Sequence, residues 1–191
     1  MPPIEFIGIR GGHGTTTVAL ATAVTLAARV PARIAAHEPT TLLTPAGIAA
    51  DGLPLDLADQ LELATDRADS DVIDAGSLDH YDGDVSPEGR LRVGVLRGPD
   101  YLGPRTLCDH PEASVDGLVV VSEPGRALDA RDVEAVSGIP VVAVVDHSPA
   151  VARAIDAGLF VHRVARCREF TLLLAWLNEL VVESPWNLVA S

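Results

Sequence analysis

The sequence lacks lysine altogether: each of the 14 basic residues among its 191 residues is arginine. Without lysine, the chain cannot form a Schiff base through a side-chain amine or bind phosphate through a loop lysine. Basic residues are also outnumbered, since 27 acidic residues give a net charge of −13. Nucleic-acid backbones and anionic lipid surfaces attract basic surfaces, so we expect neither as the main partner.

Cysteines and long apolar runs are scarce as well. Two cysteines, Cys108 and Cys167, indicate a reduced, cytoplasmic protein rather than a disulfide framework. No apolar run reaches the roughly 20 residues that a membrane-spanning helix needs, and no basic segment typical of a secretory signal follows Met1. We therefore expect a cytoplasmic protein without membrane insertion.

What the sequence does contain is typical of a folded domain. Hydrophobic residues make up 48% and charged residues 21%, which excludes a disordered or low-complexity chain. The length and the lack of an internal repeat or long linker predict a single domain over 1–191. Residues 51–84 hold eleven acidic residues against one basic residue, Arg67. This imbalance favours a solvated face with loops, and the alternative is a docking surface for a basic partner.

Apolar segments typical of buried strands alternate with segments typical of helices. The expected strands are 4–9, 33–36, 71–76, 91–96, 117–121 and 140–145. The expected helices are 15–29, 54–67, 101–108, 128–136, 149–157 (with Gly158 as its stop) and 170–182. This alternation predicts an α/β fold, a mostly parallel sheet with helices on both faces.

A glycine-rich segment, Arg10-Gly11-Gly12-His13-Gly14-Thr15-Thr16-Thr17, separates the first expected strand from the first expected helix. Glycines let backbone N–H groups converge on an anion without hindrance from Cβ atoms, and the helix N-terminus adds partial positive charge. A threonine hydroxyl at the helix start can ligate Mg²⁺. This order of elements predicts a phosphate-binding loop rather than a plain turn.

The segment resembles the deviant Walker A motif, Lys-Gly-Gly-x-Gly-Lys-Thr-Thr, of the MinD/ParA family of P-loop ATPases. Its glycines match Gly11, Gly12 and Gly14, and its threonines match Thr16 and Thr17. The resemblance implies a P-loop NTPase-like fold, binding of ATP and Mg²⁺, and a role in cell division or partitioning. The implied nucleotide-binding residues are Arg10, Gly11, Gly12, His13, Gly14, Thr15, Thr16 and Thr17, with Thr16 also a metal ligand. For His13, a phosphate contact and an exposed filler position are both open.

Later segments resemble further motifs of the family in the same order. Asp74 stands where the Walker B aspartate holds Mg²⁺ through water, so we expect it within about one side-chain length of Thr16. Residues 33–39 resemble the switch segment, and 138–160 the closing strand, turn and helix, although the turn itself departs from the usual pattern. The likeness extends to about residue 162, and short degenerate members of the CpaE/TadZ type look most similar.

Two departures remove positive charge from the expected phosphate site. Arg10 occupies the position of the family's signature lysine, and Thr15 that of the general phosphate-loop lysine. The family implies two lysines at the γ-phosphate, one from each subunit of a dimer. The loss of one such cation lowers the rate about 10²–10³-fold, by analogy with a lost oxyanion-hole donor. Ala36 also replaces the first switch acid, whereas Glu38 keeps the second. We therefore expect little or no hydrolysis and assign no catalytic residue.

Three functions remain open on these residues. The first is a dimerising scaffold or positioning adaptor, which forms a homodimer or binds another protein. The alternative is an ATP-dependent molecular switch in which Arg10 replaces the missing lysines. The third is a small-molecule enzyme that uses the same crevice for another phosphate-bearing ligand. The missing lysine counts against the second and the third alike.

Outside the loop, few residues carry a chemical signal. The spacings Cys108-x-His110 and His162-x₄-Cys167 fit no common zinc framework, and no Gly-x-Ser-x-Gly elbow occurs. Arg97 follows a strand end, where ligands bind in parallel sheets, and fits either a ligand contact or a surface ion pair.

The final expected helix, 170–182, lacks the basic residues that a membrane-targeting tail needs. We expect it to pack on the sheet or on a partner subunit through one apolar face. That face consists of Leu173, Trp176, Leu177 and Leu180.

Overall fold

A computed structural model describes residues 1–47, 55–58, 60–81, 89–98, 102–110, 114–126 and 128–183. The strands are β1 (Ile4–Gly8), β2 (Ala32–Ala36), β3 (Leu55–Ala58), β4 (Leu61–Leu63), β5 (Val72–Ser77), β6 (Leu91–Arg97), β7 (Gly117–Ser122) and β8 (Val141–Asp146). The α-helices are α1 (Thr15–Ala27), α2 (Thr40–Ala46), α3 (Leu102–Asp109), α4 (Ala130–Ser137), α5 (Pro149–Asp156), α6 (Phe160–Arg163) and α7 (Thr171–Glu183). Short 3₁₀ turns, η1 (Leu78–His80), η3 (Val164–Arg166) and η4 (Arg168–Phe170), complete the described elements.

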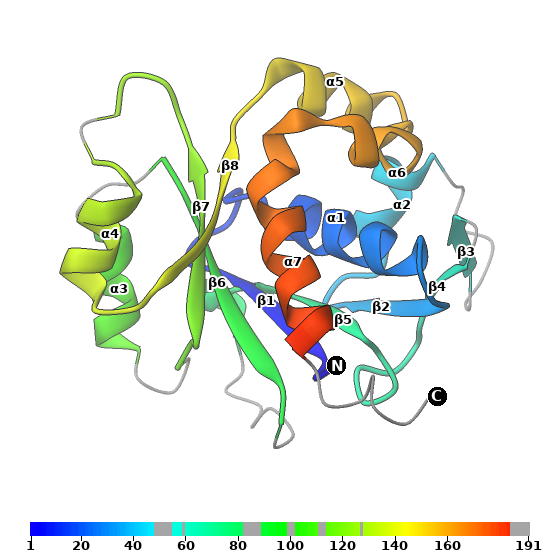
Figure 1. Cartoon of the computed structure of the whole chain (residues 1–191), viewed down its shortest axis with the longest axis horizontal. Coiled ribbons are helices and arrows are strands. Elements are labelled where there is room, and N and C mark those ends of the chain that lie inside the picture. The colour runs from blue at the N-terminus through cyan, green and yellow to red at the C-terminus, as the bar shows by residue number, and fades with distance from the viewer. Residues whose placement is uncertain are drawn as a thin grey trace.

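The described strands form one sheet in the order β3-β4-β2-β5-β1-β6-β7-β8 (Figure 1). Every neighbouring pair is parallel except β3 and β4, which are antiparallel. The predicted fold class, a mostly parallel sheet with helices on both faces, is thereby confirmed. Because β1 lies between β5 and β6, the loop that follows it opens at the middle of one sheet edge.

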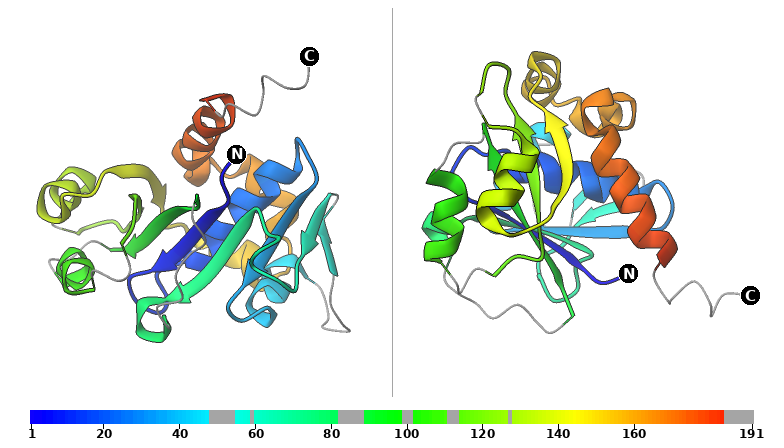
Figure 2. Two further views of the ribbon diagram at one scale, coloured as in Figure 1. Left: turned by 90° about the horizontal axis from the view of Figure 1, so that it is seen from below. Right: turned by 60° about the vertical axis from the view of Figure 1, so that its left-hand side comes forward.

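Helices cover the two faces of this sheet unequally (Figure 2). Helices α1, α2, α5, α6 and α7 contribute to the larger core, which buries Ile4 and Phe6 of β1. Helices α3 and α4 contribute to the smaller core on the other face, which buries Ile7 and Ile9. Side chains of a strand point alternately to the two faces of the sheet, so these residues are buried on both faces of β1. Burial on both faces is typical of an internal strand, and it holds the loop that follows β1 in place.

The helix expected over 54–67 is wrong. Pro54 and Asp59 lie outside the described residues, and the rest of the range contains the hairpin of β3 and β4, with Gln60 in its turn at φ 62°. Leucines at 55, 57, 61 and 63 alternate with other residues, which is the period of a strand. Pairing of β4 with β2 then stabilises the strand and overrides the helical spacing on which the expectation rested.

The other expected elements occur, with ends shifted by a few residues. Tyr101, the first residue of one expected helix, lies outside the described residues, and so does part of the acidic stretch 51–84. Helices α2 and α6 were not predicted, because seven and four residues are too few to show helical periodicity.

The final helix, α7, packs on its own sheet. Leu173 and Leu177 are buried in the larger core, and Trp176 and Leu180 are partly buried beside them. The Arg29 guanidinium, just beyond α1, donates a hydrogen bond to the Asn178 side chain. Among the helices that the structure describes, none is long and apolar enough to cross a membrane.

Helices α2 and α5 end against each other at two glycines. Gly47 and Gly158 both adopt left-handed backbone conformations, with φ of 70° and 65°. A Cβ atom on Gly158 would lie 2.5 Å from the Gly47 Cα atom. The expected stop at Gly158 is confirmed, and the glycine also allows two backbones to touch.

We predict that Gly158→Ala lowers the free energy of unfolding by more than Gly138→Ala does. Gly138 is a matched control, because its φ is 69° and nothing lies within 4 Å of a Cβ atom there. Left-handed strain alone costs about 1–2 kcal/mol, and the clash with Gly47 adds to it only at position 158. Urea denaturation of both variants measures the difference, and equal losses would contradict the close helix contact.

Candidate functional site

The glycine loop joins β1 to α1 with an exposed backbone. Gly12 and Gly14 have φ of 78° and 88°, and Gly14 is the N-cap of α1 without a capping side-chain hydrogen bond. The first N–H groups of a helix have no partner within it. A Cβ atom added at Gly11 or Gly12 would meet nothing within 4 Å, so the space beside the loop is open. The loop therefore fits an anion bound by backbone N–H groups.

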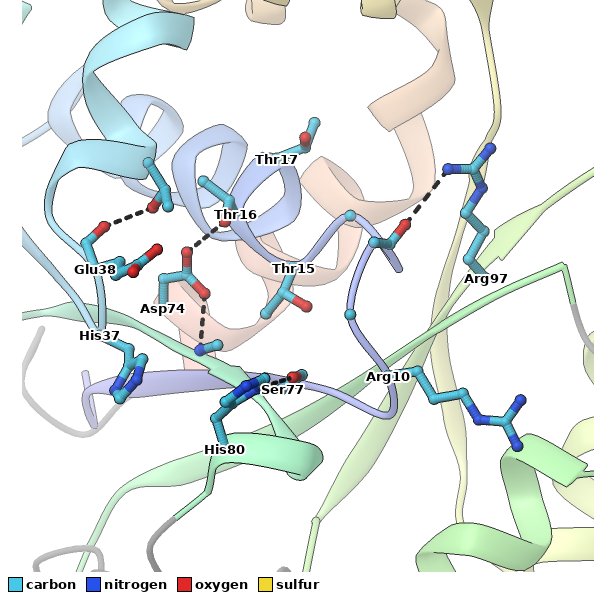
Figure 3. A pocket seen from close by; sticks show the side chains of 15 residues that line it. Arg10, Thr15, Thr16, Thr17, His37, Glu38, Asp74, Ser77, His80 and Arg97 are labelled. Carbon is cyan, nitrogen blue, oxygen red and sulfur yellow. Dashed lines mark hydrogen bonds between the residues drawn. The ribbon is translucent and has the colours of Figure 1, made fainter.

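The two expected metal ligands are in direct contact. The Thr16 hydroxyl donates a hydrogen bond of 2.6 Å to Oδ2 of Asp74, and Asp74 Oδ1 accepts one of 3.1 Å from the Gly76 N–H (Figure 3). Asp74 belongs to β5, the strand next to β1. A hydroxyl and a carboxylate suit Mg²⁺, which binds few protein ligands and keeps several waters.

Burial raises the pKa of Asp74, whose exposed fraction is 2%. The hydrogen bonds from Thr16 and Gly76 and the charges of His37 and Arg67 oppose this rise without cancelling it. Ala36 pairs with Asp74 in register, so a methyl group stands beside this carboxyl where the resemblance implied an acid.

A cavity of about 540 Å³ lies over this part of the loop. Most of the predicted loop residues line it, together with Asp74, Glu38 and Arg97. Sequence reasoning missed five further lining residues, which are His37, Thr41, Gly76, Ser77 and His80. His37 directly follows β2, and Gly76 and Ser77 end β5. Ligands bind at the carboxyl ends of parallel strands, so these positions could have indicated the three residues.

Three of the predicted loop residues, Thr15, Arg10 and His13, are poorly placed to contact a phosphate beside Asp74. Thr15 is 7% exposed, and its hydroxyl packs so closely on Gly8 that a Cβ atom there would collide with it. The Arg10 side chain points away from Asp74 (Figure 3). His13 lines a second, adjoining cavity of about 150 Å³ instead of the larger one. The loop itself therefore offers little side-chain charge beside Asp74.

The second cavity is mostly apolar and lies against α5. Residues of the expected closing turn, Asp146, His147 and Ser148, are among the residues that line it. Arg97, at the end of β6, lines both cavities.

In the described part of the chain, no group of three or more His, Cys, Asp or Glu side chains is placed to hold a metal ion. This part includes His110, His162 and Cys167, whereas the side chain of Cys108 lies outside it. Burial, followed by the charge of Glu169, raises the pKa of the Cys167 thiol, so it is a poor nucleophile.

Solved structures share the fold of this chain. No protein-family model matches the sequence, and no curated protein matches it. The septum site-determining protein MinD of Pyrococcus horikoshii, complexed with Mg-ADP, is 13% identical with a TM-score of 0.71, over 95% of this chain and 96% of that one. A chain of the MinC–MinD cell division complex of Aquifex aeolicus is 13% identical with a TM-score of 0.74, over 96% and 97%. A ParA-family ATPase of Chlorobium tepidum is 13% identical with a TM-score of 0.64, over 96% and 99%. The chain thus has the fold of the MinD/ParA P-loop NTPases.

We predict that Asp74→Asn stabilises the protein relative to wild type as the pH rises. The raised pKa of Asp74 means that the folded protein keeps this proton to a higher pH than the unfolded chain does. The contribution of Asp74 to wild-type stability therefore falls as the pH rises from about 4 toward neutrality, and Asp74→Asn removes that loss. Urea denaturation across this range measures it, with Asp69→Asn, an exposed carboxyl, as control. A variant that loses stability relative to wild type toward neutral pH would contradict the assignment.

Proposed function

We propose that this chain binds a nucleotide with Mg²⁺ at the glycine loop, hydrolyses it little or not at all, and acts as a dimerising scaffold or positioning adaptor. The observation that carries the proposal is the contact of Thr16 with Asp74 beside an open glycine loop in a chain without lysine. The solved MinD complexes with Mg-ADP and with MinC support a nucleotide ligand and a protein partner for this fold.

The residues present fit nucleotide and metal binding. Backbone N–H groups of the loop and of the first turn of α1 donate to phosphate oxygens. To hold a metal, the Thr16 hydroxyl releases its hydrogen bond and offers its oxygen, while Asp74 gives up any proton that burial favours. Bound Mg²⁺ would neutralise part of the phosphate charge.

The same residues do not support rapid hydrolysis. Thr15 is neutral and buried where a phosphate-loop cation would stand, so charge that develops on the phosphate is not offset there. Ala36 has no group that could orient a water molecule beside Asp74. We therefore expect this chain to bind a nucleotide with little or no hydrolysis.

A working ATP-dependent switch is the second candidate, and one observation favours it. Arg10 points away from Asp74, so in an isolated chain it would not serve its own metal pair (Figure 3). In a dimer that joins two loops, an outward arginine would be free to reach the partner's phosphates and restore one charge. The scaffold and the switch thus share the binding site and differ in turnover.

We predict that the wild-type protein binds ATP in the presence of Mg²⁺ and releases phosphate at the background rate. Calorimetric titration measures binding, a phosphate-release assay measures turnover, and sedimentation with and without ATP measures the oligomeric state. Turnover that Arg10→Ala abolishes would contradict the scaffold and establish the switch. A strict monomer at all concentrations would contradict the dimer.

We predict that Thr15→Lys tightens ATP binding without restoring turnover. The added ammonium makes a charge-assisted hydrogen bond of about 1.5–3 kcal/mol, which lowers Kd roughly tenfold to a hundredfold. Thr65→Lys adds the same charge at an exposed position outside the cavity and serves as control. Turnover is expected only when Ala36→Asp is combined with Thr15→Lys. If even the double variant binds no nucleotide, the loop has lost its phosphate geometry.

A further inference from the structure

We propose that Arg97 is the cation that holds the phosphates of the ligand in this site, in place of the lysine that the loop lacks. The inference rests on the nucleotide binding proposed above and assigns its main side-chain contact. Arg97 ends β6, the strand beside β1, and its side chain is 37% exposed. It lines both the cavity over the loop and the smaller cavity against α5. A ligand that occupies both cavities would therefore pass this guanidinium.

The terminal nitrogens of Arg97 have weak partners. Nη1 donates to the Gly12 carbonyl oxygen of the loop at 3.4 Å, and Nη2 lies 3.0 Å from His147 Nε2. The first distance is long for a hydrogen bond, and an uncharged ring nitrogen is a weaker acceptor than an anionic oxygen. Phosphate oxygens would displace both contacts and gain charge-assisted, bidentate hydrogen bonds.

The third nitrogen of Arg97 holds the side chain in position. Nε donates to Glu123 Oε1 at 2.9 Å, while Arg126 donates to Glu123 Oε2 through Nε at 3.0 Å and Nη2 at 2.7 Å. One carboxylate thus has two guanidinium partners, and the three residues carry a net charge of +1. Because Arg126 alone can match the charge of Glu123, the charge of Arg97 is available to an anion.

The position of Arg97 relative to the loop is also suitable for binding phosphates. Its guanidinium and Asp74 lie on opposite sides of the loop (Figure 3), and Arg10 points away from Asp74. Phosphates seated on the loop would have the metal pair of Thr16 and Asp74 at one end and Arg97 at the other. Since Arg97 stands at the junction of the two cavities, we expect it to contact phosphates nearer the second cavity. Its contribution is therefore to affinity for diphosphates as well as triphosphates.

The test compares Arg97→Gln with wild type by calorimetric titration of Mg-ADP and of magnesium pyrophosphate, at low and high salt. We expect at least a tenfold loss of affinity for both ligands at low salt and a smaller loss at high salt, because salt screens the charge. Arg97→Lys should recover part of the affinity. The control is Arg131→Gln, which removes the same charge from the exposed start of α4 and should bind as wild type does.

Three results would overturn the inference, each in a different way. Wild-type affinity in Arg97→Gln would overturn the role of Arg97 and leave nucleotide binding intact. Losses of equal size at low and high salt would assign Arg97 a structural role only. A wild-type protein that binds neither ligand would overturn the proposed function and this inference together. If thermal unfolding shows that Arg97→Gln does not fold, Arg97→Met, which keeps an apolar stem, is titrated instead.

Discussion

The hydrogen bond between Thr16 and Asp74 joins the two parts of the molecule on which the site depends, the start of α1 and strand β5. It forms only because β1 and β5 are adjacent and parallel, so that their carboxyl ends meet at one edge of the sheet. The glycines between β1 and α1 let the chain turn there without covering the exposed N–H groups. The buried core on both faces of β1 keeps this turn in place.

The distribution of charge around that hydrogen bond supports our proposal that this chain binds a nucleotide and hydrolyses it little or not at all. A buried carboxyl and a hydroxyl offer a small site for a hard cation, and a neutral threonine occupies the position beside it that the resemblance gives to lysine. Positive charge lies on Arg97, on the far side of the loop from Asp74 (Figure 3), where under our proposal it would attract phosphates. Under the proposed function, this arrangement favours binding of a ligand over its chemical conversion.

Much of the fold could be predicted from the sequence, because its strands are short apolar runs and its glycine loop has a specific pattern. The proximity of Thr16 and Asp74 was predicted from the resemblance to the MinD/ParA motifs, which implies that both residues belong to one metal site. The hairpin of β3 and β4 was missed because its leucines fit two periodicities, and only pairing with β2 decides between them. The shared position of Arg97 between two cavities was also beyond prediction, since it depends on Glu123 and His147, which are distant in the sequence.

The most direct test of this account is a crystal structure of the protein grown with Mg²⁺ and ADP. We expect phosphates on the backbone N–H groups of the loop, a metal ion between Thr16 and Asp74, and a broken hydrogen bond between these two side chains. A structure in which the hydrogen bond of 2.6 Å persists and the nucleotide is absent from the loop would contradict it.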